Sequence, residues 1–352
     1  MKKSHILLIT IFIGLTLLMS ACVPGPRVTG SPGLAIADDS VYVAYGNFVF
    51  SLNASSGVVN WGYPDKANNQ VIFYAPPLVT QDSVYVGDLA NDFHKLNRET
   101  GQEEWVFTGA KGFYLGQAAE MNGVVYAPNN DGSLYAIGED GGLLWSFATG
   151  HYLWSQPQVT ESRIYIGSMD HFVYAISTSG DEIWSAELSG AVSGAPLLNE
   201  DGTILYAGSL GKQMYALDTD TGKPIWTFDA NESVWGTSLL VDGNLLFSDD
   251  SGTIYAVNAE TGAPVWQTEY AGNIVGGLTA ISDGFVIATK EGVVKAYDIE
   301  GSPKWESSLD GEIYQAPVVN SDYLIAGTIK GDNLVYGFNL TGVQLWSTTP
   351  EK

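Results

Sequence analysis

The sequence predicts an all-β fold built from eight similar units. Eight tryptophans recur along the 352-residue chain at intervals of 39 to 44 residues, and they are Trp61, Trp105, Trp145, Trp184, Trp226, Trp266, Trp305 and Trp346. A period of this length, sustained along the chain, indicates a repeat architecture. Each unit also holds four short runs of β-branched, aromatic and aliphatic residues. Four strands in about forty residues match one blade of a β-propeller.

The unit at residues 193–231 shows how each element is recognised. Its apolar runs read SGAPLL, TILYAGS, MYALD and PIWTFD, and the segments NEDG, LGKQ and TDTGK separate them. Such runs are typical of strands, and such Gly-, Asp-, Asn- and Thr-rich segments are typical of hairpin turns. No amphipathic helical stretch of useful length follows residue 22.

The repeat assigns eight blades, each contiguous in sequence. Their expected bounds are 33–65, 73–110, 115–150, 154–190, 193–231, 233–271, 274–310 and 313–349. The first blade begins with its own inner segment, GLAIADD, and the last ends with its own outer segment, VQLWSTT. We therefore expect the propeller at 33–349 to close by packing of blade 8 against blade 1, without a blade shared between the chain ends.

The segment that leads to each tryptophan has a physical explanation. In the pattern Ala-x-Asp-x-x-Thr-Gly-x-x-x-Trp, the glycine supplies the positive φ of a tight turn. The polar residues before it can hydrogen-bond the turn backbone. The tryptophan is large and carries one N–H donor, so it is suited to start the outer strand and dock on the neighbouring blade. We interpret all eight tryptophans as structural docking residues.

The same pattern resembles the tryptophan-docking motif of the PQQ-like (pyrroloquinoline-quinone-type) β-propeller family. The residues that match it in full are Ala216, Asp218, Thr221, Gly222 and Trp226, and the next copy carries Asn258 in place of the aspartate. The resemblance covers residues 33–349. The family includes the quinoprotein alcohol dehydrogenases and the BamB-type lipoproteins of the outer-membrane β-barrel assembly machinery, so it implies either quinone-dependent catalysis or non-catalytic protein binding.

The N-terminus predicts export and a lipid anchor. Residues 1–21 contain a basic start and a fourteen-residue apolar core, as in a signal peptide, and that core is short for a membrane span. The segment from Leu18 to Cys22 resembles a bacterial lipobox, whose cysteine is diacylated and becomes the first residue of the mature chain. The alternative is an ordinary signal peptide followed by an unpaired cysteine. Residues 22–32 are expected to form a flexible lipid-anchored tether, and 350–352 a short tail.

The charge of the chain excludes some partners. Without Lys2 and Lys3, 13 basic and 39 acidic residues remain, a formal charge of about −26. Such a chain is not expected to bind nucleic acid or to adhere to anionic lipid through a basic patch. The acidic residues lie mostly in expected turns, so we interpret them as a solvated surface.

No pattern in the sequence predicts catalysis. His94, His151 and His171 follow the signal peptide but fall in three different blades, without metal-ligand spacing. Haem, zinc-protease, phosphate-loop and nucleophile-elbow motifs are missing. The resemblance to quinoprotein dehydrogenases would imply large insertions and an adjacent cysteine pair, and Cys22 is the only cysteine in the chain. We therefore predict no catalytic residue, no metal and no cofactor.

Four aromatic residues differ from the rest of the repeat. Three residues before the expected start of the innermost strand, blades 2, 4, 6 and 8 carry an aromatic and the other blades do not. The four are Tyr74, Trp154, Trp235 and Tyr314. This position lies close to the central channel, so the side chains could ring one channel mouth and act as binding anchors. Alternatively, they pack beneath the loops between blades.

These observations predict a non-catalytic, monomeric propeller that is lipid-anchored outside the cytoplasm and binds protein partners of the bacterial cell envelope. Membrane contact is expected through the lipid on Cys22 only, in either the cell membrane or the outer membrane. The alternative from another functional class is a sensor of a small ligand or glycan that uses the aromatic mouth. A third alternative is a degenerate quinoprotein enzyme.

Overall fold

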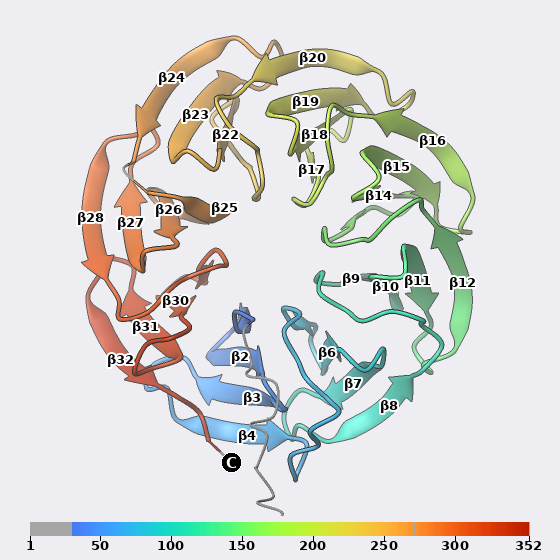
Figure 1. Cartoon of the computed structure of the whole chain (residues 1–352), viewed down its shortest axis with the longest axis vertical. Coiled ribbons are helices and arrows are strands. Elements are labelled where there is room, and N and C mark those ends of the chain that lie inside the picture. The colour runs from blue at the N-terminus through green and yellow to red at the C-terminus, as the bar shows by residue number, and fades with distance from the viewer. Residues whose placement is uncertain (1–29, 271, 352) are drawn as a thin grey trace, which may run out of the picture.

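The computed structural model of the chain describes residues 30–270 and 272–351, and within these it contains 32 strands and no helix. The strands form eight four-stranded antiparallel sheets around a central channel (Figure 1). Each sheet consists of four strands that are consecutive in the chain. The prediction of an eight-bladed propeller with contiguous blades is therefore confirmed. The expected signal peptide and Cys22 lie outside the described residues.

Within each blade the strands run in order from the channel to the rim. The strands of blades 1 to 4 are β1 (Gly33–Ala37), β2 (Ser40–Tyr45), β3 (Phe48–Asn53), β4 (Val59–Tyr63), β5 (Leu78–Val79), β6 (Ser83–Gly87), β7 (Phe93–Asn97), β8 (Glu103–Phe107), β9 (Ala119–Met121), β10 (Val124–Pro128), β11 (Ser133–Ile137), β12 (Leu143–Ala148), β13 (Gln158–Val159), β14 (Arg163–Gly167), β15 (Phe172–Ser177) and β16 (Glu182–Glu187). The strands of blades 5 to 8 are β17 (Leu197–Leu198), β18 (Ile204–Ser209), β19 (Gln213–Asp218), β20 (Pro224–Asp229), β21 (Leu239–Val241), β22 (Asn244–Ser248), β23 (Thr253–Asn258), β24 (Pro264–Glu269), β25 (Ile274–Ile281), β26 (Gly284–Thr289), β27 (Val293–Tyr297), β28 (Pro303–Ser308), β29 (Val318–Val319), β30 (Tyr323–Gly327), β31 (Val335–Asn339) and β32 (Gln344–Thr348).

The core lies between blades. The two middle strands of a blade are buried along most of their length, because a neighbouring sheet covers each of their faces. The cluster between blades 5 and 6, for example, combines Tyr206 and Met214 with Leu245, Phe247 and Tyr255. Outer strands such as β20 are mostly exposed instead, with Trp226 buried and Phe228 half-buried. The apolar runs in the sequence therefore mark the middle strands most clearly.

The turn before each outer strand follows the chemistry expected from the motif. In blade 5, Asp218 Oδ1 accepts hydrogen bonds from the backbone N–H of Thr221 at 2.8 Å and from its hydroxyl at 2.6 Å, and Gly222 has φ of +69°. The register between β19 and β20 then shifts at Ala216 and Leu217. Such a bulge bends the outer strand against the next blade. The carboxylate of Asp218 therefore stabilises its own turn.

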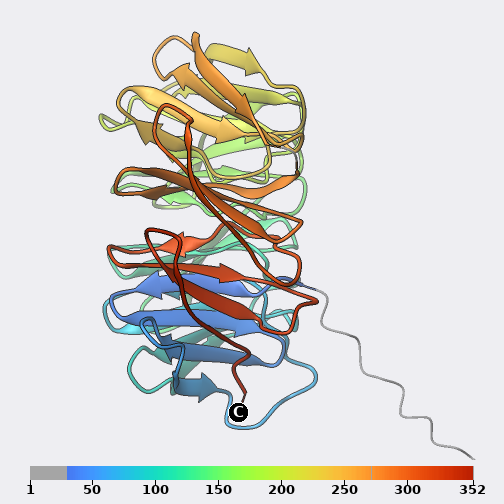
Figure 2. The ribbon, with the colours of Figure 1, turned by 90° about the vertical axis from the view of Figure 1, so that its left-hand side faces the viewer.

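The up-and-down order gives the propeller two distinct faces. The first strand of each blade begins at one end of the channel, so the connections between blades and the second hairpin of each blade lie on that face. We call it the mouth face; it is seen edge-on in Figure 2. Backbone bonds between these loops, such as Leu210 N–H to Ala191 O, hold the mouth face together. The first and third hairpins of each blade form the far face.

Candidate binding site at the channel mouth

The docking tryptophans lie at the interfaces between blades. In seven interfaces the indole N–H donates a hydrogen bond to a backbone carbonyl of the next blade. The pairs are Trp61 to Arg98, Trp105 to Glu139, Trp145 to Thr178, Trp184 to Thr219, Trp226 to Ala259, Trp305 to Leu340 and Trp346 to Ala54, at 2.8 to 3.2 Å. Trp266 packs instead against the turn of the next blade at Gly301.

The turn glycine of each blade has a second role that sequence reasoning missed. A Cβ on Gly222 would lie 2.6 Å from the indole of Trp184 in the preceding blade. The same contact recurs around the ring, for example between Gly262 and Trp226. The position therefore needs glycine both for its positive φ and because an indole lies against its Cα. In the sequence, the pairing of one glycine with one tryptophan in every repeat was the pattern from which this packing role could have been predicted.

Two of the four alternating aromatics meet at the channel mouth. The rings of Trp154 and Trp235 lie 6.5 Å apart between centroids, although they belong to blades 4 and 6. Trp154 donates its N–H to Asn130 Oδ1 at 2.8 Å, and Trp235 is 41% exposed.

Blade 5 allows this contact because its equivalent positions are small. Ser193 Oγ donates to the carbonyl of Trp235 at 3.3 Å. A Cβ on Gly194 would lie only 2.6 Å from the carbonyl of Gly236. A larger side chain at position 194 would therefore collide with the backbone of blade 6.

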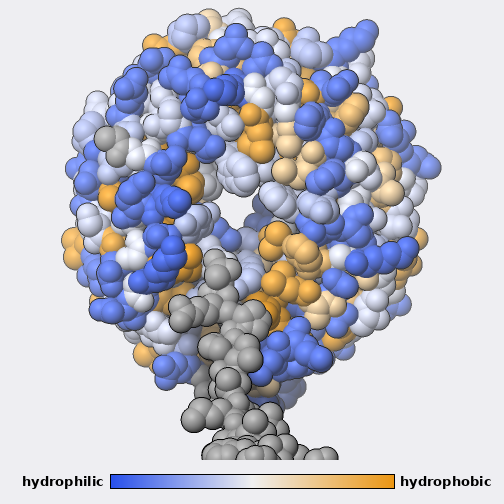
Figure 3. Space-filling model, viewed as in Figure 1, coloured by the Kyte–Doolittle hydropathy of each residue, from blue (hydrophilic) through white to orange (hydrophobic). Residues whose placement is uncertain are grey.

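A third aromatic, missed in the sequence, extends the pair. Tyr152 stacks on Trp154 at 6.2 Å and 19°, and it is 41% exposed. The ring of His151 contacts Tyr152 at 4.2 Å. We call Tyr152, Trp154 and Trp235 the aromatic patch. It lies on the mouth face, on which Figure 3 shows the open channel with apolar residues beside it.

The other two alternating aromatics have different partners. Tyr314 is 38% exposed, its hydroxyl donates to Glu312 at 2.6 Å, and the Lys290 ammonium lies 5.6 Å from its ring centre. Tyr74 is partly buried and contacts the ring of Tyr45 at 6.4 Å. The structure therefore joins Trp154 and Trp235, whereas Tyr74 and Tyr314 lie apart from them against other groups. None of the four is fully buried.

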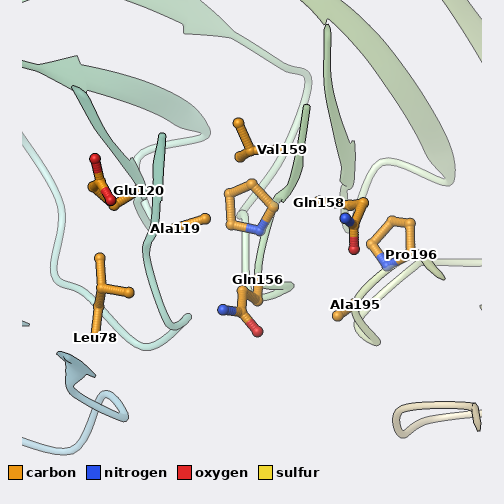
Figure 4. Close-up of a pocket in the computed structure, with 9 residues that line it drawn as sticks. Leu78, Ala119, Glu120, Gln156, Gln158, Val159, Ala195 and Pro196 are labelled. Carbon is orange, nitrogen blue, oxygen red and sulfur yellow. The ribbon is translucent and has the colours of Figure 1, made fainter. Parts of the chain in front are cut away.

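A small cavity opens into the wall of the channel. It has a volume of about 300 Å³ and lies among the innermost segments of blades 2 to 5 (Figure 4). Its polar groups are the carboxylate of Glu120 and the amides of Gln156 and Gln158, with Leu78 and Pro196 beside them. The cavity thus offers one carboxylate and two neutral amides for hydrogen bonding. None of its lining residues is basic or aromatic.

The strongest cluster of ionisable groups lies within blade 2, where the hydroxyl of Tyr63 from blade 1 lies 3.3 Å from His94 Nδ1. His94 is 5% exposed, its Nδ1 lies 2.9 Å from Glu103 Oε1 and its Nε2 lies 3.4 Å from the buried Asp88 carboxylate. Burial alone lowers the pKa of His94, but the hydrogen bonds to Asp88 and Glu103 outweigh it and raise that pKa to about 9. The bond to His94 also lowers the pKa of Glu103. A charged imidazole between two carboxylates therefore stabilises the folded state of this blade.

Within residues 30–270 and 272–351, no group of three or more His, Cys, Asp or Glu side chains is arranged to hold a metal ion. No helix in the described part of the chain is long and apolar enough to cross a membrane.

Comparison with known proteins places the chain in a family. The profile of the family described as outer membrane protein assembly factor BamB matches residues 19–146, 130–251 and 250–352. An outer membrane protein assembly factor BamB of Nitrosomonas eutropha (strain DSM 101675 / C91 / Nm57) is 30% identical over 127 residues, which are 35% of this chain and 31% of the relative's length.

Two solved structures share the fold. BamB from Moraxella catarrhalis superposes with a TM-score of 0.74 at 19% identity, covering 87% of this chain and 93% of that one. The computationally designed Ika8 protein superposes with a TM-score of 0.76 at 16% identity, covering 89% and 98%. A designed protein matches as well as a natural one, so these likenesses establish the architecture alone. Because the family profile spans the propeller from end to end, the chain belongs to the family of the outer membrane protein assembly factor BamB.

Proposed function

We propose that this chain is a non-catalytic scaffold of the bacterial cell envelope that binds a protein partner through its aromatic patch. The family and the curated relative, both described as an outer membrane protein assembly factor, support a role among proteins that assemble the outer membrane. The contact between Trp154 and Trp235 carries the proposal, because it places two large rings from different blades at one exposed point.

The patch has the physical properties of a binding anchor. Aromatic side chains bury a large area and lose little rotamer entropy on binding, since few torsions become fixed. Trp235 and Tyr152 are each 41% exposed, so each has area left to bury. Trp154 is held by its bond to Asn130 and by its stack on Tyr152, which keeps the patch in one conformation before a partner arrives.

We further propose that the chain is exported and held at a membrane by a lipid on Cys22. The lipobox-like segment that ends at Cys22, together with the lack of a second cysteine to pair with it, supports this anchor. A lipid tether fits a scaffold, because it raises the local concentration of the propeller near membrane-bound partners without a new protein contact.

The experiment for this function is complementation in a bacterium that lacks its own copy of the chain. The parent chain is expected to restore the level of folded outer-membrane proteins, and the Trp154→Ala, Trp235→Ala double variant is expected to fail. The control is the double variant Ile225→Ala, Val265→Ala, which removes exposed apolar groups from outer strands away from the patch. Full complementation by the tryptophan variant would rule out the patch as the functional surface.

A glycan is the alternative ligand, because Tyr152 and Trp235 offer exposed ring faces beside the polar channel wall. Titration of the purified propeller with oligosaccharides, followed by calorimetry, separates the two. A saturable change that is lost in the Trp154→Ala, Trp235→Ala variant would favour the sensor over the scaffold.

A further inference from the structure

We infer that the cavity in the channel wall binds a small neutral saccharide, held by the side-chain amides of Gln156 and Gln158 and by the carboxylate of Glu120. The cavity lies inside the channel, on blades 2 to 5, and none of the three rings of the aromatic patch lines it. It is therefore a second binding site, and it does not depend on whether the patch binds a protein.

Gln158 differs from the residues at the same position of the other blades. In β13 it pairs with Tyr165 of the second strand, and the same cross-strand pairing identifies one equivalent residue in every blade. Six of the seven equivalents are apolar and one is a threonine: Ala35, Leu78, Ala119, Leu197, Leu239, Thr279 and Val318. Because the fold accepts an apolar side chain at this position in most blades, folding does not require an amide there.

The fold does not use the amide of Gln158. Its neighbour Gln156 donates through Nε2 to the carbonyl of Ala118, at 3.3 Å, and so joins blade 4 to blade 3. The hydroxyl of Thr279 donates to the carbonyl of Pro317, at 2.8 Å, and joins blade 7 to blade 8. Among the residues that the structure describes, none forms a hydrogen bond with the half-buried side chain of Gln158. An amide that is partly withdrawn from water and unused by the fold is available to a ligand.

Glu120 is a second departure from the repeat, and it lines the same cavity. It pairs with Val125 of the second strand. The equivalent residues of the other seven blades are all apolar: Ile36, Val79, Val159, Leu198, Leu240, Ala280 and Val319. The Oε1 atom of Glu120 accepts a hydrogen bond from the backbone N–H of Gly123, at 2.6 Å. Its Oε2 has no hydrogen-bond partner in the described part of the chain, so this oxygen can accept a hydrogen bond from a ligand.

The lining selects the chemistry of the ligand. An amide offers both donors and an acceptor, whereas a carboxylate offers acceptors alone. A sugar hydroxyl suits both groups, because it donates one hydrogen bond and accepts others. Leu78, Val159 and Pro196 add apolar surface for the C–H faces of a sugar ring. An anion is disfavoured, since no lining residue is basic and the chain carries a large net negative charge.

The shape of the cavity fits a small ligand. Its volume of about 300 Å³ lies at the lower end of the range of small-molecule sites, with room for roughly one or two sugar rings. Figure 4 shows Gln156 with Leu78 and Glu120 on one side and Gln158 and Pro196 on the other. A ligand seated beside Gln156 therefore has a polar group of a neighbouring segment on either side of it.

Calorimetric titration of the purified chain tests the site. The neutral probes are maltose and the disaccharide of N-acetylglucosamine, the cationic probe is the disaccharide of glucosamine, and the anionic probe is digalacturonate. The variant Gln158→Leu carries the side chain that Leu78 and Leu197 place at the same position, so it is expected to fold. The matched control is Gln344→Leu, which changes an exposed glutamine on the outer strand β32.

We expect saturable binding of at least one neutral disaccharide, and an affinity at least about tenfold lower for Gln158→Leu, because a ligand hydroxyl loses its partner. Gln344→Leu should bind as the parent does. No saturable binding of either neutral disaccharide at millimolar concentrations would overturn the inference, and so would equal affinities of the parent and Gln158→Leu. Binding of the glucosamine disaccharide alone, lost in Glu120→Gln, would overturn the neutral class of ligand.

Two further variants keep the test decisive. Ala195→Leu narrows the cavity from blade 5 without removing a polar group, so it should also weaken binding. If Gln158→Leu does not fold, unchanged affinity in Ala195→Leu would overturn the inference. The Trp154→Ala, Trp235→Ala variant should bind the disaccharide as the parent does, because neither tryptophan lines the cavity. Loss of binding in that variant would place the saccharide at the aromatic patch and overturn the channel site.

Discussion

The indole N–H of Trp346 donates a hydrogen bond to the carbonyl of Ala54, at 2.8 Å, across 292 residues of sequence. This contact joins the last blade to the first and reproduces the bond that Trp226 makes to Ala259 between blades 5 and 6. Side chains of both blades, including Leu52 and Val335, share one core at the seam. The ring therefore closes with the same kind of interface that joins its other blades, and no strand is exchanged between the chain ends.

The contact that Trp226 makes with blade 6 should contribute a large part of the stability of that interface. Trp226→Ala deletes an indole that is 9% exposed and a hydrogen bond, so we expect the free energy of unfolding to fall by about 3–5 kcal/mol. Because repeat proteins are stabilised by nearest-neighbour interfaces, the loss should weaken blades 5 and 6 together. Denaturant unfolding measures the change, with the exposed Trp235→Ala as control. Equal stability of the two variants would contradict the docking role.

The turn glycines allow backbone strain to be separated from packing. Gly202 and Gly222 have nearly the same φ, +73° and +69°, but a Cβ on Gly202 meets nothing within 4 Å. Gly202→Ala should therefore cost about 1–2 kcal/mol, from the left-handed backbone alone. Gly222→Ala should cost about 1–3 kcal/mol more, because its Cβ also displaces the indole of Trp184. Thermal unfolding of the two variants gives the difference, and equal melting temperatures would show that the indole contact is unimportant.

The stability of the chain should depend on pH through His94. Its pKa is raised from 6.5 to about 9, so the folded state binds a proton that the unfolded state lacks between these values. The resulting stabilisation is fully present below pH 6.5 and is lost as the pH rises through about 9. We expect a loss of up to about 3 kcal/mol over this window.

Urea unfolding at pH 6, 7.5 and 9.5 checks this dependence. The His94→Gln variant should be less stable at pH 6 and should lose most of the decline toward pH 9.5. The control, His151→Gln, removes an exposed histidine and should keep the decline of the parent. A parent whose stability is constant from pH 6 to 9.5 would contradict the charged imidazole between Asp88 and Glu103.

The lipid anchor gives a separate prediction. Cys22→Ser removes the thiol that would carry the diacylglycerol, so the variant should accumulate as a soluble or uncleaved form. Metabolic labelling with a radioactive fatty acid is the measurement, and the parent should be labelled. Label retained on the variant would mean that the lipid is attached elsewhere or that the lipobox interpretation is wrong.

The sequence predicted the ring more fully than it predicted the site. One tryptophan in each period marks the same point of every blade, so the count and the order of the strands follow from local patterns. The contact between Trp154 and Trp235 joins blades 4 and 6, which are not neighbours in sequence, and no local pattern contains it.

The charged cluster at His94 was missed for a related reason. His94 occupies a position that other blades fill with a tyrosine, such as Tyr174 and Tyr255, whose hydroxyls donate to aspartates. Its partners, Asp88 and Glu103, come from a loop and an outer strand that are brought together only by folding. The substitution was visible in the repeat, but its electrostatic consequence required the three-dimensional arrangement.

The central claim is that the aromatic patch captures a protein partner, and its most direct measurement is an affinity. The lipidated chain and its Trp154→Ala, Trp235→Ala variant would be titrated with the purified outer-membrane assembly proteins of the same organism. We expect the variant to lose about 2 kcal/mol of binding free energy, which corresponds to an approximately 30-fold higher Kd. Its melting temperature should stay close to that of the parent. An unchanged Kd, or a weakened Kd that is matched by a large fall in melting temperature, would contradict the claim.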